Sequence, residues 1–226
     1  MPGCRLSFDR LLLAGPSPHG ACELGYATPG HSILTAPGSP MTELTYTAAA
    51  DEDLEQILAL QRQNVEEELC PDEVVADGFV TVRHDLPLLR DMNRAESHIV
   101  AKSGGRVVGY ALVMLRAFED RIPILGPMYD KLSRLSYQGR PVEEYRYFIM
   151  GQVCVAKLFR GSGAFAGMYS KMRALYSPKY RMVITEVARR NMRSIRAHEK
   201  VGFELLHRYR DSAAEEWDVV LCDWGK

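Results

Sequence analysis

The stretch of this chain that decides its fold is a glycine-rich turn, Arg160-Gly161-Ser162-Gly163-Ala164-Phe165. An apolar run at residues 147–155 precedes the turn, and residues 165–175 carry apolar side chains at helical spacing. A glycine-rich turn that leads into a helix exposes several backbone N–H groups at the positive end of the helix dipole, where phosphate groups bind. The pattern therefore predicts a strand, a turn and a helix that together bind a phosphorylated ligand.

Two other kinds of phosphate-binding loop fit the turn less well. A Walker-type loop needs Lys followed by Ser or Thr after its last glycine, whereas this chain has Ala164 and Phe165 there. The dinucleotide fingerprint G-x-G-x-x-A is matched by Gly161, Gly163 and Ala166, but it normally follows the first strand of a parallel sheet. The short remainder of the chain leaves little room for such a sheet.

A second stretch complements the turn: Asn191-Met192-Arg193-Ser194-Ile195-Arg196-Ala197-His198-Glu199-Lys200-Val201-Gly202-Phe203. The turn resembles the Q/R-x-x-G-x-G/A motif of the GNAT superfamily of N-acetyltransferases, and the second stretch resembles that family's N-x-x-A/S-x-x-x-Y-x-K-x-G-F segment. Two residues depart from the pattern. Phe165 stands where the motif has Gly or Ala, and His198 stands where the family usually has Tyr. The chain thus resembles a bacterial-type member of this superfamily.

The resemblance implies a site for acetyl-CoA as co-substrate, with no metal. A strand edge left unpaired would offer backbone groups to the pantetheine arm, and the amides of the turn would bind the pyrophosphate. Arg160 either adds positive charge there or is solvated, and Asn191 caps its helix and positions the coenzyme. The residues expected at the coenzyme are Val153, Cys154, Val155, Arg160, Gly161, Ser162, Gly163, Ala164, Phe165, Asn191, Arg196 and Lys200.

The chemistry that the resemblance implies is attack of an amine on a thioester carbonyl, which calls for a base and for an acid at the departing thiolate. Glu186, in an apolar strand, is similar to the glutamate of ribosomal-protein N-terminal acetyltransferases and is the candidate base, acting through water. His198, at the place of that branch's tyrosine, is the candidate acid, and Gln152 could order a water near the thioester. Structural roles stay open for all three: an arginine partner or solvent for Glu186, a place in the scaffold for His198, and pairing with the backbone for Gln152.

The composition is that of an ordinary globular protein, with 226 residues, a formal net charge of -1 and 46% hydrophobic residues. This near-neutral balance argues against nucleic-acid binding. No apolar run approaches the roughly 20 residues that cross a bilayer, so no membrane contact is expected. The five cysteines, widely spaced, form neither a metal pair nor a disulfide framework, which favours a reducing cytoplasm.

The first forty residues differ from the rest, because they hold six of the twelve prolines and six of the eighteen glycines. We expect residues 1–40 to be a disordered extension and residues 41–226 to be a single acetyltransferase-like domain. Alternation and helical spacing in that domain predict an α/β (α+β) fold. Its mixed, mostly antiparallel twisted sheet is flanked by helices and has one parallel β-α-β crossover at the coenzyme site. Predicted strands are 44–48, 98–102, 106–115, 147–155, 181–187, 203–210 and 216–224, and predicted helices include 86–93, 128–135 and 191–201.

The function predicted from these features is direct transfer of an acetyl group from acetyl-CoA to a primary amine. Cys154 has no histidine obviously paired with it, so no covalent intermediate is expected. The acceptor would be the amine of a small molecule or of a peptide, and the resembling family makes a homodimer possible. Two alternatives stay open: a non-catalytic module that binds or senses acyl-CoA, and, more remotely, a dinucleotide-binding oxidoreductase.

Overall fold

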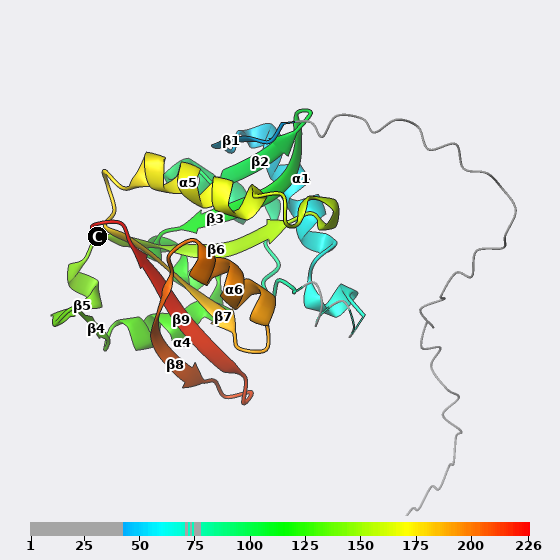
Figure 1. Cartoon of the computed structure of the whole chain (residues 1–226). Coiled ribbons are helices and arrows are strands. Elements are labelled where there is room, and N and C mark those ends of the chain that lie inside the picture. The colour runs from blue at the N-terminus through cyan, green and yellow to red at the C-terminus, as the bar shows by residue number, and fades with distance from the viewer. Residues whose placement is uncertain (1–42, 71, 73, 75–77) are drawn as a thin grey trace, which may run out of the picture. The chain divides into compact units, whose positions relative to one another are not determined.

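The structure is a computed structural model, which describes residues 43–226 apart from 71, 73 and 75–77. The extension predicted for residues 1–40 therefore lies outside the described residues. Within the described part, a seven-stranded sheet runs through the molecule in the order β1-β2-β3-β6-β7-β9-β8 (Figure 1). None of the helices in this part of the chain is long and apolar enough to cross a membrane.

The sheet matches the predicted topology. Its neighbouring strands are antiparallel except for β6 and β7, which are parallel and joined through a helix. The strands are β1 (Thr45–Ala48), β2 (Ile99–Ser103), β3 (Arg106–Met114), β6 (Tyr147–Val155), β7 (Met182–Ala188), β8 (Glu204–Arg210) and β9 (Glu216–Asp223), with a separate hairpin of β4 (Ser136–Tyr137) and β5 (Arg140–Pro141). A mostly antiparallel sheet is not the doubly wound parallel sheet of dinucleotide-binding proteins, which removes the structural basis for that alternative.

Helices cover both faces of the sheet (Figure 1). The α-helices are α1 (Asp51–Arg62), α3 (Leu86–Ala95), α4 (Gly126–Leu132), α5 (Ala164–Tyr176) and α6 (Met192–Lys200), and the short 3-10 helices are η1 (Glu66–Glu68), η2 (Arg116–Arg121), η3 (Pro123–Leu125), η4 (Val142–Glu144) and η5 (Lys157–Phe159). Side chains of α5 and α6 pack on one face, and those of α1, α3 and α4 pack on the other.

Helix α5 packs closely because its buried residues recur every three or four positions. They are Ala164, Met168, Tyr169, Met172 and Tyr176. Full burial of a methionine side chain contributes about 1.5–3 kcal/mol to the stability of the fold. Gly167 lies on the same helix, and a Cβ built there would stand 2.1 Å from the Tyr46 ring, so the tyrosine of β1 can lie against α5 only where the helix has no side chain. This packing holds the beginning of α5 in place beside β6.

A bulge in β6 opens the sheet at its centre. Leu112 of β3 pairs with Gln152, and Val113 pairs with Met150, so Gly151 is an extra residue in β6. Such a bulge bends its strand and increases the local twist. Strands β6 and β7 accordingly pair over only three positions, Tyr147 to Ile149. Beyond them, the edge of β6 that faces β7 has no strand partner in the described structure, which is the splay that the pantetheine arm was predicted to use.

Candidate functional site

The glycine turn lies directly between β6 and α5, as predicted. Gly161 and Gly163 have φ angles of 81° and 88°, in the left-handed region that only glycine adopts without strain. No atom lies within 4 Å of a Cβ built at either position, so the backbone angle and not crowding is what requires glycine. The helix begins at Ala164, and the N–H groups of its first turn have no partners within the helix. The turn therefore presents free amides to a ligand.

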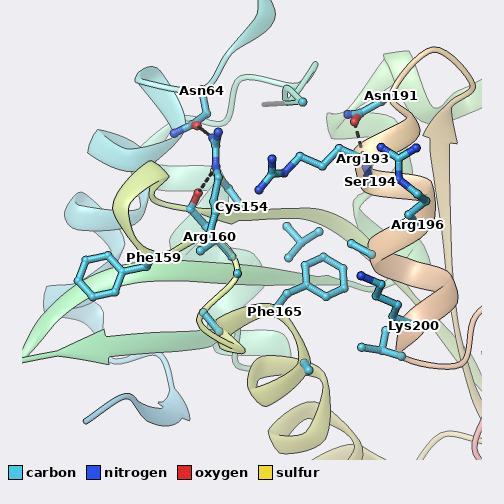
Figure 2. A pocket seen from close by; sticks show the side chains of 18 of the residues that line it. Asn64, Cys154, Phe159, Arg160, Phe165, Asn191, Arg193, Ser194, Arg196 and Lys200 are labelled. Atoms are coloured by element: carbon cyan, nitrogen blue, oxygen red, sulfur yellow. Dashed lines mark hydrogen bonds between the residues drawn. The ribbon is translucent and has the colours of Figure 1, made fainter. Parts of the chain in front are cut away.

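A cavity of about 520 Å³ opens between this turn, the end of β6 and helix α6 (Figure 2). Its lining includes the backbone edge at Val153, Cys154 and Val155, which the sequence predicted. Among the described residues, the lining contains four basic side chains and no carboxylate. The basic residues are Arg160, Arg193, Arg196 and Lys200. A cavity with this charge attracts an anion, and its size suits a large one.

Arg160 is held rigidly at one wall of the cavity (Figure 2). Its Nε donates to the carbonyl oxygen of Val155 at 3.1 Å, and its Nη2 donates to Oδ1 of Asn64 at 2.6 Å. Asn64, which is itself buried, donates through Nδ2 to the carbonyl of Leu60. Arg160 is thus not a solvated side chain, and its charge is fixed beside the strand edge and the glycine turn.

Helix α6 forms the opposite wall, and Asn191 caps it as predicted. Its Oδ1 accepts from the backbone N–H of Ser194 at 3.1 Å, and its Nδ2 donates to the carbonyl of Phe79. The arginines in this helix and just before it fall into two groups. Arg193 and Arg196 line the cavity, whereas Arg189 and Arg190 form ion pairs with carboxylates outside it. The pairs join Arg189 to Asp218 and Arg190 to Glu66 and Glu215.

Phe165 projects from the start of α5 toward α6 (Figure 2), where its ring contacts His198 and Tyr169 at centroid distances of 5.1 and 4.9 Å. His198 is buried, with 2% of its surface exposed. Its Nδ1 lies 2.8 Å from the carbonyl oxygen of Ser194, which can only accept, so the proton is on Nδ1 and Nε2 accepts from the Tyr169 hydroxyl at 3.0 Å. These contacts build an aromatic cluster that joins α5 to α6.

The predicted role of His198 as an acid does not agree with these contacts. Both ring nitrogens are hydrogen-bonded inside the protein. Burial lowers the pKa of His198 to about 4, against the smaller effect of the Ser194 carbonyl, which raises it. The imidazole is neutral at about pH 7 and holds its single proton in a structural bond. His198 is therefore part of the scaffold, the alternative that was left open.

Gln152 is also held within the fold. Its Nε2 donates to the carbonyl of Val82 at 2.8 Å, and its Oε1 accepts from Nε2 of Gln61 at 2.7 Å and from the Tyr110 hydroxyl at 2.6 Å. Gln61 also bonds to His84, which extends the buried network under β6. These bonds to backbone and side chains agree with the structural alternative for Gln152.

Cys154 is a buried thiol and not a nucleophile. Burial raises its pKa to about 12, so the thiolate is not formed near neutral pH. Among the residues that the structure describes, no group of three or more His, Cys, Asp or Glu side chains is placed to hold a metal ion.

Glu186 lies in a second, smaller cavity of about 70 Å³ on the other side of the splay. Both cavities are lined by Val153 and Ser194, so they adjoin at the open edge of β6. Of the described residues that line the smaller one, Glu186 is the only one with a carboxylate. Burial raises the pKa of Glu186 to about 7, opposed by a hydrogen bond from Tyr209 and helped by the charge of Asp211. A carboxylate with such a pKa can accept a proton near neutral pH.

Several residues at the site carried no local signal in the sequence. Asn64 and Tyr209 are far along the chain from the side chains that they bond, Arg160 and Glu186. Tyr129 of α4 is fully buried on the same face of the sheet as Glu186, and its hydroxyl has no hydrogen-bond partner. These groups come together only when the strands pair and the helices dock. The alternation of apolar and polar residues within one strand therefore could not predict their contacts.

Comparison with known proteins gives the same family that the motifs suggested. Residues 54–203 match a family model described as the acetyltransferase (GNAT) family. Comparison with curated protein sequences gives no match.

Solved structures with a similar fold include a ribosomal-protein-alanine N-acetyltransferase from Brucella melitensis, 20% identical, with a TM-score of 0.53 over 79% of this chain and 99% of that one. An N-acetyltransferase from Staphylococcus aureus Mu50 is 15% identical, with a TM-score of 0.52 over 80% of this chain and 99% of that one. A chain of the NatC complex bound to Gag peptide and CoA is 14% identical, with a TM-score of 0.52 over 80% and 98%. At these identities the likeness concerns the fold alone.

Proposed function

Because the chain belongs to the acetyltransferase (GNAT) family, we propose that it transfers an acetyl group from acetyl-CoA directly to a primary amine. One observation carries the proposal. A cavity lined by basic side chains and by the glycine turn adjoins a smaller cavity that contains one carboxylate, and the two meet at the open edge of β6. This gives separate places for an anionic acyl donor and for an amine.

The residues of the larger cavity fit coenzyme A. Its pyrophosphate would bind backbone N–H groups at the positive end of α5, such as those of Ala164 and Phe165 in the first turn of the helix. Its amide-containing arm would bond to the unpaired edge at Val153, Cys154 and Val155. The remaining phosphate oxygens would meet the positive charges of Arg160, Arg196 and Lys200. No carboxylate among the described lining residues competes with phosphate for these side chains.

Glu186 would act as the base in the smaller cavity. It takes a proton from the ammonium group through a water, and the neutral amine nitrogen then attacks the thioester carbon. The nitrogen releases its second proton to solvent as the carbon–sulfur bond breaks. The sulfur leaves with the electron pair of that bond and takes a proton from solvent, since the single proton of neutral His198 is held in its bond to the Ser194 carbonyl. Holding the amine and the thioester at the junction of the two cavities would supply much of the acceleration.

The acceptor would be the amine of a small molecule or of a peptide. The NatC complex, which contains a chain of similar fold, was solved with a Gag peptide and CoA bound. The protein of similar fold from Brucella melitensis is named a ribosomal-protein-alanine N-acetyltransferase. The smaller cavity supports an acceptor with a single positive charge, because it offers one carboxylate. A polyamine would bring several ammonium groups to this one partner.

The test combines calorimetry with acetyl-CoA and an assay of thiol release with a panel of monoamines, polyamines and peptides with a free amino terminus. We expect acetyl-CoA to bind and at least one monoamine or peptide to release thiol. Glu186→Gln should bind acetyl-CoA like the wild type but release much less thiol. No binding of acetyl-CoA at millimolar concentration would overturn the proposal.

One observation favours a second candidate, a non-catalytic module that binds or senses acyl-CoA. Of the three predicted catalytic residues, Gln152 and His198 serve the scaffold. A sensor needs the larger cavity but no base. Normal binding of acetyl-CoA without thiol release for any amine, and with no difference between the wild type and Glu186→Gln, would support this candidate.

A further inference from the structure

Tyr209 reaches Glu186 across an intervening strand. Strand β9 lies between β7 and β8, and Glu186 pairs with Val219 while Tyr209 pairs with Trp217. Because Trp217 and Val219 are two residues apart, all four side chains lie on one face of the sheet. The Tyr209 hydroxyl donates to Oε2 of Glu186 at 2.6 Å. This distance is typical of a hydrogen bond to a charged carboxylate.

The bond leaves the two carboxylate oxygens of Glu186 in different surroundings. Oε2 is occupied by Tyr209, whereas no hydrogen bond from the described residues reaches Oε1. Glu186 also lines the smaller cavity together with Gly151, the residue of the bulge. One oxygen is therefore anchored to β8, and the other is available at the opening between β6 and β7.

Other charged and titratable groups also act on this carboxylate. Asp211, which follows β8, is held by the indole N–H of Trp217 at 2.9 Å and contributes negative charge. From α4, Tyr129 lies within electrostatic reach, and the ammonium of Lys131 stands 5.7 Å from the centre of the Tyr209 ring. His198 of α6 lines the same cavity but is neutral. Tyr209 alone among these groups donates a hydrogen bond to Glu186.

We propose that Tyr209 is the positioning residue for Glu186, fixing Oε2 so that Oε1 meets the proton of the acceptor amine. This rests on the proposed function, in which Glu186 is the base. The hydroxyl has two effects. It limits rotation of the carboxylate, and it favours the charged form, the form that accepts a proton, although burial and Asp211 oppose that form.

Tyr209→Phe tests the proposal, because it removes the hydroxyl and keeps the ring. Loss of a hydrogen bond to the charged form moves the pKa of Glu186 upward from about 7, and we expect a shift of about one unit. The acidic limb of the profile of kcat/KM against pH should move to higher pH by the same amount. Activity should fall at least about fivefold near pH 7, and the part of this loss that comes from the pKa should be recovered near pH 9, whereas the part that comes from a freely rotating carboxylate should remain.

A matched control is Tyr137→Phe. The Tyr137 hydroxyl also donates to a glutamate at 2.6 Å, but this glutamate is Glu204, which is exposed and lines neither cavity. We expect its pH profile to match that of the wild type. If the acidic limb of Tyr209→Phe does not move, or if Tyr137→Phe moves it equally, the positioning role is wrong.

A second measurement separates this inference from the proposed function. The Glu186 carboxyl can be followed by carbon-13 NMR in labelled protein, where its signal is the one lost in Glu186→Gln. Its pKa should rise in Tyr209→Phe and not in Tyr137→Phe, whether or not any amine is acetylated. A protein without transferase activity would overturn the proposed function, whereas an unchanged NMR titration in Tyr209→Phe would overturn the role of Tyr209.

Discussion

Tyr129 has a hydroxyl that the fold does not use. The side chain, which belongs to α4, is fully buried, and its oxygen has no hydrogen-bond partner among the described residues. A buried polar group without a partner costs about 1–3 kcal/mol. Tyr129→Phe removes this cost and keeps the ring, so the free energy of unfolding should stay equal or rise by up to about 1 kcal/mol. Urea unfolding measures this.

The matched control is Tyr176→Phe, which removes a hydroxyl that donates to the carbonyl of Ser97. That substitution should destabilise the protein by about 1 kcal/mol. A loss of stability in Tyr129→Phe as large as in Tyr176→Phe would show that the Tyr129 hydroxyl has a partner in solution.

Glu186 should show opposite effects on activity and on stability. Without the base, Glu186→Gln should lose at least about 100-fold in kcat. The raised pKa means that the folded protein binds a proton more tightly than the unfolded chain, so ionised Glu186 lowers stability as pH rises from about 4.5 to about 7.

Glu186→Gln should therefore stabilise the protein by up to about 3 kcal/mol above pH 7 and change little near pH 4.5. Thermal unfolding at the two pH values measures the difference. Equal effects of the substitution at both would contradict the raised pKa.

For single residues, the sequence predicted the roles that depend on neighbours along the chain. The cap at Asn191 and the glycines of the turn belong to this class. Whether Glu186 acts as a base or His198 as part of the scaffold depends on burial and on partners from other elements. Such contacts arise only when strands pair and helices dock, so the residues alone left both roles open.

Among the elements, the glycine turn should respond to substitution through its backbone angles. Gly163 has φ of 88°, and an alanine there would cost about 1 kcal/mol in the left-handed region. Gly163→Ala should lower the free energy of unfolding by about that amount. The same strain would change the direction in which the first backbone N–H groups of α5 point. Gly163→Ala should therefore also weaken acetyl-CoA binding several-fold in calorimetry.

Gly126→Ala is the matched control, since Gly126 has φ of -51° at the start of α4 and no atom lies within 4 Å of a Cβ built there. Alanine favours the helix, so this variant should be equal or slightly more stable and should bind acetyl-CoA normally. If both variants behave alike, the left-handed turn is not what binding requires.

Elements with a clear period were predicted well, and the segment between β3 and β6 was not. The strand predicted at 147–155 is β6, residue for residue. The helix predicted at 128–135 is α4, which begins two residues earlier and ends at Leu132. Short 3-10 helices precede and follow α4, and Arg116 of η2 forms an ion pair with Glu143 of η4. Long-range contacts stabilise these turns, and no local repeat marks them.

At the scale of the molecule, three histidines that are buried in the described part of the chain make the fold sensitive to acid. Burial lowers the pKa values of His84 and His198 to about 4 and that of His98 to about 3. The unfolded chain binds protons at these residues below about pH 6.5, whereas the folded protein does not, so stability falls as pH decreases from 6.5. Glu186 acts in the opposite direction but is a single group.

We expect the free energy of unfolding to fall by several kcal/mol between about pH 7 and pH 5. Urea midpoints across this range measure the change, and they should return fully when the pH is restored. A midpoint that stays constant down to pH 5 would show that the histidines are solvated in the folded protein.

The splay of the sheet has a consequence for how the molecule handles charge. Strands β6 and β7 pair at only three positions, so the two halves of the sheet are joined at one end of this seam. The glycine turn and Arg160 are on one side of the opening, and Arg193, Arg196 and Lys200 of α6 are on the other (Figure 2). Like charges on the two sides repel each other, whereas a polyanion between them is attracted to both. A polyanion at this place therefore offsets the repulsion between the two sides of the sheet.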